Sequence, residues 1–275
     1  MASCVPLPPR GLPFTLSQRS SRCCEAGPHR FPDFWTGAVR IGASDLRLAG
    51  CCEGVERHRE HGALRRWIVI YYDYYADIPP ETIDAFVRER EIGRLVTVSP
   101  AGFPHLGLYP FAYQGNCIEV HLNRRDEQIA DLEAHPRCVF EVDDVLGVIP
   151  SYWVHPEDAV MATAYHRTVI FECEAVVSQD GAVLAEQQMR LLARYQPEGG
   201  FRPVTPDDPL YRGAIAHIAA VRLDIRDRRP KFKLGQNRSL DIRAKIVNEL
   251  RERGRPNDAR AADALQWTID RERQR

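Results

Sequence analysis

The sequence predicts a mostly β fold with flanking helices, built as a small antiparallel barrel. Short apolar runs of strand length follow one another on turn signals such as "SPAG" and "QGN", and few segments show helical spacing. The sequence contains no GxGxxG, P-loop or GxSxG string, which excludes the common dinucleotide, nucleotide and hydrolase classes.

The first half of the barrel is predicted from turns and alternation. Residues 78–91 begin with prolines and place Ile83, Phe86 and Val87 at helical spacing, which favours a helix. Residues 93–122 read as three strands, and residues 125–136 as a short helix with Ile129 and Leu132 facing inward. A fourth strand is expected at 137–144. A fifth is expected at 146–154, bent or at an edge because of its proline.

The elements of the second half of the chain are predicted from the same kinds of pattern, periodicity and turn residues. Residues 165–181 predict a long strand with a turn after it, and residues 182–196 an amphipathic helix with Leu184, Met189, Leu191 and Leu192 near one face. Residues 201–213 are rich in proline and are expected to form a loop before a final strand at 214–225. Two helices, 239–253 and 257–273, are expected to close the chain.

Composition sets the class of protein. The 275 residues are 44% hydrophobic and 27% charged with a formal net charge of -1, as in a globular protein with a sizeable core. No membrane-length apolar run or signal-peptide core occurs, so we expect a cytoplasmic protein. From Arg226 onward, 15 Lys and Arg stand against 8 Asp and Glu. This basic end indicates either an anionic ligand or partner, or solvated helix faces.

Residues 1–70 form an irregular leader rich in Pro, Arg, Cys and Ser, without a sustained helix or strand period. We interpret this leader as disordered or as an over-extended reading frame, with translation starting near Val69 or Tyr71. A targeting or regulatory tail and a small folded cap are the alternatives. The folded domain is expected to span residues 71–275, with a helical tail from about residue 239.

Three strings resemble the FMN-binding split barrel of pyridoxamine-phosphate-oxidase-like proteins: "EIGRLVTVSPAGFPHLGLYPFAY", "IEVHLNRRDEQIADLEAHPRCVFEVDD" and "YHRTVIFECEA". The tail string "KLGQNRS", followed by two helices, resembles the PaiB-type branch, flavin-binding proteins described as negative transcriptional regulators. The resemblance implies FMN as cofactor, or a deazaflavin in its place. It also implies a homodimer with the flavin at the subunit interface.

The resemblance implies which residues contact the flavin. They are Leu108, Tyr109, Pro110 and Phe111 along one strand; His121, Asn123, Arg124, Arg125 and Gln128 around the phosphate-side turn; Arg167 and Thr168; and Lys233, Gln236, Asn237 and Arg238 in the tail. Asn123, Arg124 and Arg125 stand at a helix start, where a phosphate is favoured. The alternative is that both arginines are turn residues pairing with Asp126 and Glu127.

The tail loop carries more hydrogen-bonding groups than a turn requires. Ser239 is expected to cap the next helix and Gly235 to form a turn, but neither explains Lys233, Gln236, Asn237 and Arg238. We hypothesise that the loop reaches the flavin edge across the dimer interface. The alternative is that these side chains tie the loop to its own backbone.

Three functions remain open. The first is a PaiB-type regulator or flavin-binding protein, and the second is an FMN-dependent oxidoreductase acting on a small molecule. The third is a flavin-free nucleic-acid-binding module, which no helix-turn-helix or zinc-finger motif supports. No catalytic set can be nominated from spacing. The eight cysteines and nine histidines show no metal-ligand spacing, so we expect no metal site.

Overall fold

The computed structural model describes residues 72–275, so the expectations for residues 1–70 lie outside the described residues. The strands are β1 (Ile92–Val98), β2 (Pro104–Pro110), β3 (Ala112–Tyr113), β4 (Cys117–Asn123), β5 (Arg137–Ile149), β6 (Thr163–Ser178) and β7 (Ile218–Lys233). The α-helices are α1 (Asp73–Ala76), α2 (Pro80–Glu89), α3 (Glu127–Ala134), α4 (Gly181–Tyr195), α5 (Pro209–His217), α6 (Leu240–Arg253) and α7 (Asp258–Arg273). Two short 3₁₀ turns, η1 (Ser151–Trp153) and η2 (Ala159–Met161), join β5 to β6.

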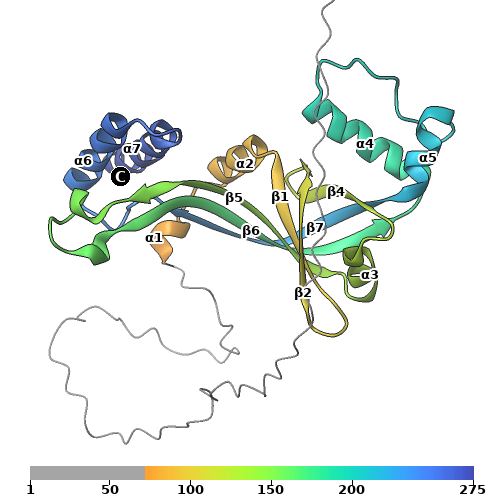
Figure 1. Cartoon of the computed structure of the whole chain (residues 1–275), viewed down its shortest axis with the longest axis horizontal. Helices are drawn as coiled ribbons and strands as arrows, with labels where there is room; N and C mark the ends of the chain where they lie inside the picture. Colours follow the sequence, from red (N-terminus) through yellow and green to blue (C-terminus); the bar gives the residue numbers. More distant parts are fainter. Residues whose placement is uncertain (1–71) are drawn as a thin grey trace, which may run out of the picture. The chain divides into compact units, whose positions relative to one another are not determined.

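All the described strands belong to one seven-stranded sheet in the order β2-β1-β5-β6-β7-β4-β3, and every neighbouring pair is antiparallel. The long strands β5, β6 and β7 run through its centre (Figure 1). β7 pairs with β6 over most of its length, but Glu172 faces Asp227 while Cys173 faces Ile225, so Arg226 is an extra, unpaired residue. This sheet with flanking helices confirms the predicted mostly β class.

One hydrophobic core joins the sheet to four helices, α2, α3, α6 and α7. Phe86 of α2, Phe140 of β5, Phe171 of β6 and Leu265 of α7 are each at most 2% exposed and belong to the same cluster. Figure 1 shows α2, α6 and α7 on one side of the sheet and α1 on the other. Burial of these side chains contributes about 1.5–3 kcal/mol each, which fixes the helices on this face.

The outer face of the sheet carries exposed apolar side chains instead. Ile92, Leu106, Leu108 and Val145 alternate with buried residues on β1 and β5 and with half-buried residues on β2, and each is between 45% and 60% exposed. An antiparallel sheet that meets water on one face normally presents polar residues there. The apolar outer face is therefore an exposed apolar patch on β1, β2 and β5, next to charged residues such as Arg94 and Asp143.

Several predicted elements are confirmed. Ile83, Phe86 and Val87 are the buried residues of α2, and Ile129 and Leu132 are buried in α3. Ser239 caps α6, its side chain accepting a hydrogen bond from the Ile242 N–H at 3.4 Å. No helix among residues 72–275 is long and apolar enough to cross a membrane.

Three predicted boundaries are wrong. The strands expected at 137–144 and 146–154 form a single strand, β5, with a bulge between Val145 and Gly147. The proline-rich loop contains the start of α5, because the Asp208 side chain accepts from the Leu210 N–H at 2.9 Å and caps the helix. The last strand begins at Ile218 and runs to Lys233 instead of ending at 225. Its second half is rich in Arg and Lys, so its sequence shows no apolar strand pattern.

Candidate functional site

Apart from residues 108–111 on and after β2, the residues predicted to bind the flavin lie near the two ends of β7. At one end Asn123 pairs with Ile218, the first residue of β7. At the other end His166 pairs with Lys233, the last residue of β7. Fifteen residues separate these ends, which corresponds to about 50 Å along a strand. One chain therefore does not bring all the predicted residues into one site.

At the α3 end, Arg124 is engaged by the protein itself. Its guanidinium donates to the carbonyl oxygens of Ile218, Gln179 and Ile215 at 2.8, 3.1 and 3.3 Å. Arg125 is exposed, and its backbone N–H donates to the Asn123 side chain at 2.9 Å. Of the two arginines, Arg125 is the one whose side chain is open to an anion.

The start of α3 already carries a carboxylate. The Asp126 side chain accepts from the Gln128 N–H at 3.0 Å, which satisfies part of the helix N-terminus and places a negative charge there. A phosphate at this point would therefore be held by side chains rather than by the helix end alone.

Gln128 is buried and connects three elements. Its amide donates to the Leu95 carbonyl at 3.0 Å, and its side-chain oxygen accepts from the Tyr109 hydroxyl at 2.6 Å. Burial raises the pKa of Tyr109 to about 12, so this hydroxyl keeps its proton. Gln128 and Tyr109 thus hold β1, β2 and α3 together, which the sequence reading did not anticipate.

The side chains of residues 108–111 point to different sides of the sheet. Leu108 is exposed on the outer face, whereas Tyr109 points inward and Phe111 is fully buried. The Tyr195 hydroxyl bonds the Phe111 N–H and carbonyl, each at 2.9 Å. β2 is an edge strand of the described sheet, so its outer backbone groups, including those near Pro110, remain open to a ligand.

His121 lies on the face of β4 that also carries Glu119, which pairs with Arg190 of α4. Burial lowers the pKa of the His121 imidazole, which is therefore neutral near pH 7. Its Nδ1 is buried and has no hydrogen-bond partner among residues 72–275.

At the other end of β7, a cavity of about 450 Å³ lies between α1, the η1–η2 turns and the loop after β7. We call it the tyrosine–lysine cavity; its polar lining residues are Tyr72, Tyr74, Tyr75, Thr163, Tyr165, Lys231, Lys233, Asn237 and Arg238. No carboxylate is among the described residues that line it. Lys233 and Arg238 form no ion pair with any described carboxylate, and the charged side chains that line this cavity are all cations.

Gly235 and Arg243 hold the loop that lines this cavity in place. Gly235 has φ +79°, and a Cβ there would lie 2.5 Å from the Tyr165 hydroxyl, so only glycine lets the loop approach Tyr165. The buried Arg243 donates to the Arg238 carbonyl at 3.1 Å and to the Thr268 hydroxyl at 3.2 Å. These contacts fix the loop that presents Asn237 and Arg238.

Gln236 bonds the backbone of its own loop, which was the alternative to a flavin contact. Its side-chain oxygen accepts from the Leu234 N–H at 2.8 Å and its amide donates to the Phe232 carbonyl at 2.6 Å, so it ties the loop to its own backbone. Asn237 and Arg238 line the cavity instead. The sequence reading missed Tyr72, Tyr75, Tyr165 and Lys231. The tyrosine-rich string "YYDYY" before α2 was the available signal.

Arg167 and Thr168 do not act together. Adjacent strand residues point to opposite faces. Arg167 donates to Asp144 at 2.6 Å on the side of α2, whereas the Thr168 hydroxyl lies 3.1 Å from His166 Nδ1. Thr168 pairs with Lys231, so it lies near the tyrosine–lysine cavity, and Arg167 does not line it.

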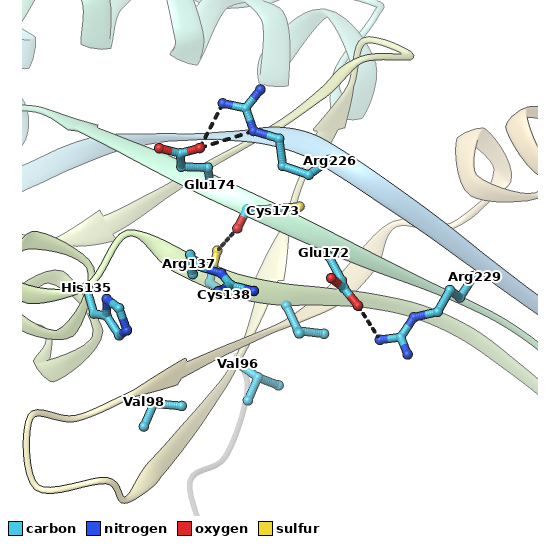
Figure 2. Close-up of a pocket in the computed structure, with 11 residues that line it drawn as sticks. Val96, Val98, His135, Arg137, Cys138, Glu172, Cys173, Glu174, Arg226 and Arg229 are labelled. Carbon is cyan, nitrogen blue, oxygen red and sulfur yellow. Dashed lines mark hydrogen bonds and ion pairs between the residues drawn. The ribbon is translucent and has the colours of Figure 1, made fainter. Parts of the chain in front are cut away.

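A second cavity, of about 640 Å³, is lined by residues of β1, β5, β6 and β7 (Figure 2). Two of its arginines are neutralised, Arg226 by Glu174 at 2.9 Å and Arg229 by Glu172 at 3.0 Å. Burial raises the pKa of the Cys138 thiol to about 12 and also raises that of Cys173, so neither is a thiolate nucleophile at neutral pH. We assign this cavity no chemistry. Among the described residues, no cluster of His, Cys, Asp and Glu has the arrangement of a metal site.

Comparison with known proteins decides the family. Residues 71–227, more than half of the chain, match the family described as "Putative FMN-binding domain". The chain belongs to this family. FMN is therefore its cofactor, and the predicted resemblance to the FMN-binding split barrel is confirmed at the level of family and fold.

One solved structure supports the fold. The flavocytochrome Anf3 from Azotobacter vinelandii superposes with a TM-score of 0.50 and 20% identity, covering 60% of this chain and 72% of that one. The conserved hypothetical protein Rv2991 from Mycobacterium tuberculosis aligns with a TM-score of 0.44 and 21% identity, covering 58% and 88% of the two chains. No curated protein matches the sequence.

Proposed function

We propose that the protein is a cytoplasmic, homodimeric, FMN-dependent oxidoreductase acting on a small molecule. In this proposal the flavin lies between the α3 end of one protomer and the tyrosine–lysine cavity of its partner. FMN supplies the electron or hydride chemistry, while the chain supplies binding, orientation and charge.

The observation that carries the proposal is the charge of the tyrosine–lysine cavity. Lys231, Lys233 and Arg238 line it with no carboxylate among its described lining residues. Cations beside a flavin favour its reduced form, because reduction places negative charge on the ring edge. The hydroxyls and Asn237 add donors suited to the polar ring edge or to a substrate. This donor set fits FMN.

Two further features support a site shared by two chains. The α3 end and the cavity are about 50 Å apart along β7, which is more than one flavin spans. The apolar outer face, including Leu106 and Leu108, would be covered by a second copy. At the α3 end, the exposed Arg125 is the side chain we assign to the phosphate.

The ion pairs of the basic C-terminal segment argue against a nucleic-acid-binding surface. Nine of its arginines form ion pairs among the described residues: Arg226 with Glu174, Arg228 with Asp84, Arg229 with Glu172, Arg243 with Glu272, Arg251 with Asp263, Arg253 with Asp258, Arg260 with Asp144, and Arg271 and Arg275 with Asp77. Paired arginines contribute little to phosphate neutralisation. This favours the oxidoreductase over a PaiB-type regulator or a flavin-free DNA-binding module.

The experiment begins with the absorbance spectrum and mass of any ligand that co-purifies with the protein, which separates FMN from a deazaflavin. The loaded protein is then mixed with reduced nicotinamides under air-free conditions, and flavin bleaching is followed with and without candidate electron acceptors. Steady turnover is expected. Absence of flavin reduction by any donor, together with salt-sensitive DNA binding in a gel-shift assay, would favour the regulator instead.

A further inference from the structure

A cavity of about 430 Å³ is lined by residues of α2, β6, β7 and α7 and by Leu234, which follows β7. The helices α2 and α7 lie on the same side of the sheet (Figure 1). We call it the arginine cavity; it is lined by Thr82, Glu89, Arg90, Arg167, Phe232, Leu234, Arg260, Asp263, Ala264 and Trp267. The function proposed above makes no use of it.

Three arginines of this cavity converge on one buried carboxylate. Asp144 is 7% exposed, and its Oδ2 lies 2.6 Å from Arg167, 2.5 Å from Arg260 and 3.3 Å from Arg90. Because arginine stays protonated, these three positive charges meet two carboxylates, Asp144 and the exposed Glu89, which lies 3.2 Å from Arg90. The arginines hold the pKa of Asp144 below its usual value, although burial opposes them, so it remains a carboxylate.

The cluster also has unused donors. The Nε atoms of Arg90 and Arg167 are buried and have no hydrogen-bond partner among residues 72–275. Both guanidinium groups lie over the Phe86 ring, at 5.5 and 4.9 Å from its centroid, which compensates part of their charge. Buried guanidinium N–H donors without a partner are costly unless an anion supplies the missing acceptors.

We propose that the arginine cavity binds a small molecule carrying one carboxylate or phosphate group on a flat apolar body. The oxyanion would bind the guanidinium groups beside Asp144. The apolar body would pack against Phe232, Leu234 and Trp267, which form the apolar part of the wall. Glu89 and Asp263 also line the cavity, but their side chains are 58% and 77% exposed, so solvent screens their charge.

This site is distinct from the tyrosine–lysine cavity. Phe232 stands between Lys231 and Lys233 on β7, and alternation sends it to the opposite face of the sheet. Lys231 and Lys233 line the tyrosine–lysine cavity, whereas Phe232 lines the arginine cavity. A ligand bound at one site therefore does not contact the side chains of the other.

The test uses the full chain as purified and two probes with the same ring, benzoate and benzyl alcohol. Binding is followed by tryptophan fluorescence and by calorimetry, while the flavin absorbance is recorded separately. Benzoate is expected to bind saturably and to change the fluorescence, and the uncharged benzyl alcohol is not. The Trp267→Phe variant is expected to lose the fluorescence change, because Trp267 lines the site.

Two variants remove different parts of the site. Arg260→Gln deletes one cation at a side chain that is 45% exposed, and it should weaken benzoate about tenfold, as loss of one charge-assisted hydrogen bond does. Ala264→Leu narrows the cavity without changing charge and should also weaken binding. The control Arg202→Gln removes an exposed ion-paired arginine elsewhere and should bind as the native chain does.

Equal binding of the two probes, or unchanged benzoate affinity in Arg260→Gln and Ala264→Leu, would overturn the proposal. Because this readout does not depend on turnover, an inactive or flavin-free preparation still reports on the arginine cavity. Failure of the oxidoreductase proposal and failure of this one are thus seen in different measurements.

Discussion

The two ends of β7 both carry positive side chains, but the protein uses them differently. At the α3 end, Arg124 donates to three backbone carbonyls and its hydrogen bonds are complete. At the loop end, Lys231, Lys233 and Arg238 surround a cavity whose described lining contains no carboxylate. The difference leads us to expect ligand binding from Lys233 and Arg238, which pair with no described carboxylate, and not from Arg124, whose donors bind carbonyl oxygens.

The largest effect is expected when the loop end loses its charge. Replacing Lys233 and Arg238 together with Ala should weaken FMN binding by about 3 kcal/mol or more, since each charge-assisted hydrogen bond contributes about 1.5–3 kcal/mol. The fold should survive, because both side chains line a cavity. Flavin titration beside thermal unfolding measures both effects, with the exposed Lys245→Ala as control. Full flavin affinity in the double variant would remove the loop from the site.

The second effect separates support of the loop from ligand contact. Arg243 is 1% exposed and holds the Arg238 carbonyl and Thr268, so Arg243→Leu should cost about 2–3 kcal/mol of stability. Hydrogen exchange should increase around residues 235–239 and α6 but not at α3. Equal loosening of both ends would contradict a local role.

A smaller effect distinguishes the two arginines of the α3 end. Arg124→Ala should lower stability by about 1.5–3 kcal/mol and change FMN affinity little, because its donors bind carbonyls. Arg125→Ala should do the reverse, weakening FMN about tenfold without a change in melting temperature, because its side chain is exposed. The two variants serve as controls for each other. If both variants changed the same property, stability or FMN affinity, the different roles proposed for Arg124 and Arg125 would be wrong.

The smallest effect is expected in the pH dependence of stability, through His105 near α3 and His166 near the loop after β7. The hydrogen bond with Asp131 raises the pKa of His105 above its ordinary 6.5, so its contribution to stability is present below pH 6.5 and is lost as pH rises through the folded pKa. Burial, with Lys231 and Lys233, lowers the pKa of His166 below 6.5. Its unfolded form takes up the proton first, so stability is lost as pH falls below 6.5 toward the folded pKa.

NMR titration of the two imidazoles checks these directions. In Lys233→Ala the pKa of His166 should rise toward 6.5, whereas that of His105 should not move. A His166 pKa that ignores Lys233 would show that burial alone sets it.

The sequence was sufficient for elements whose burial is periodic. Alternation predicted β6, and helical spacing predicted α2 and α4, because each has one face in the core. It was insufficient for the second half of β7, where only Pro230 and Phe232 are buried among charged residues. There the strand is held by pairing with β6, which lies about 60 residues earlier in the chain.

For the candidate site, residue types were easier to predict than their neighbours. The motif "KLGQNRS" pointed to the loop, and Asn237 and Arg238 do line a cavity. The same motif did not reveal that Gln236 bonds the backbone of Phe232 and Leu234, or that Tyr165 lies against Gly235. These contacts depend on where the loop folds back, and local pattern carries no information about that.

Arg226, the bulge residue that has no pairing partner in β6, sets the register of β7. Before it, the odd-numbered Ala219, Val221 and Leu223 face the core; after it, the even-numbered Pro230 and Phe232 do. One residue fewer would turn Lys231 and Lys233 into the core and push Phe232 out to the face of the tyrosines. Both cavities at this end of the sheet therefore depend on a single inserted position, and deletions in β7 that spare every cavity residue would still abolish both.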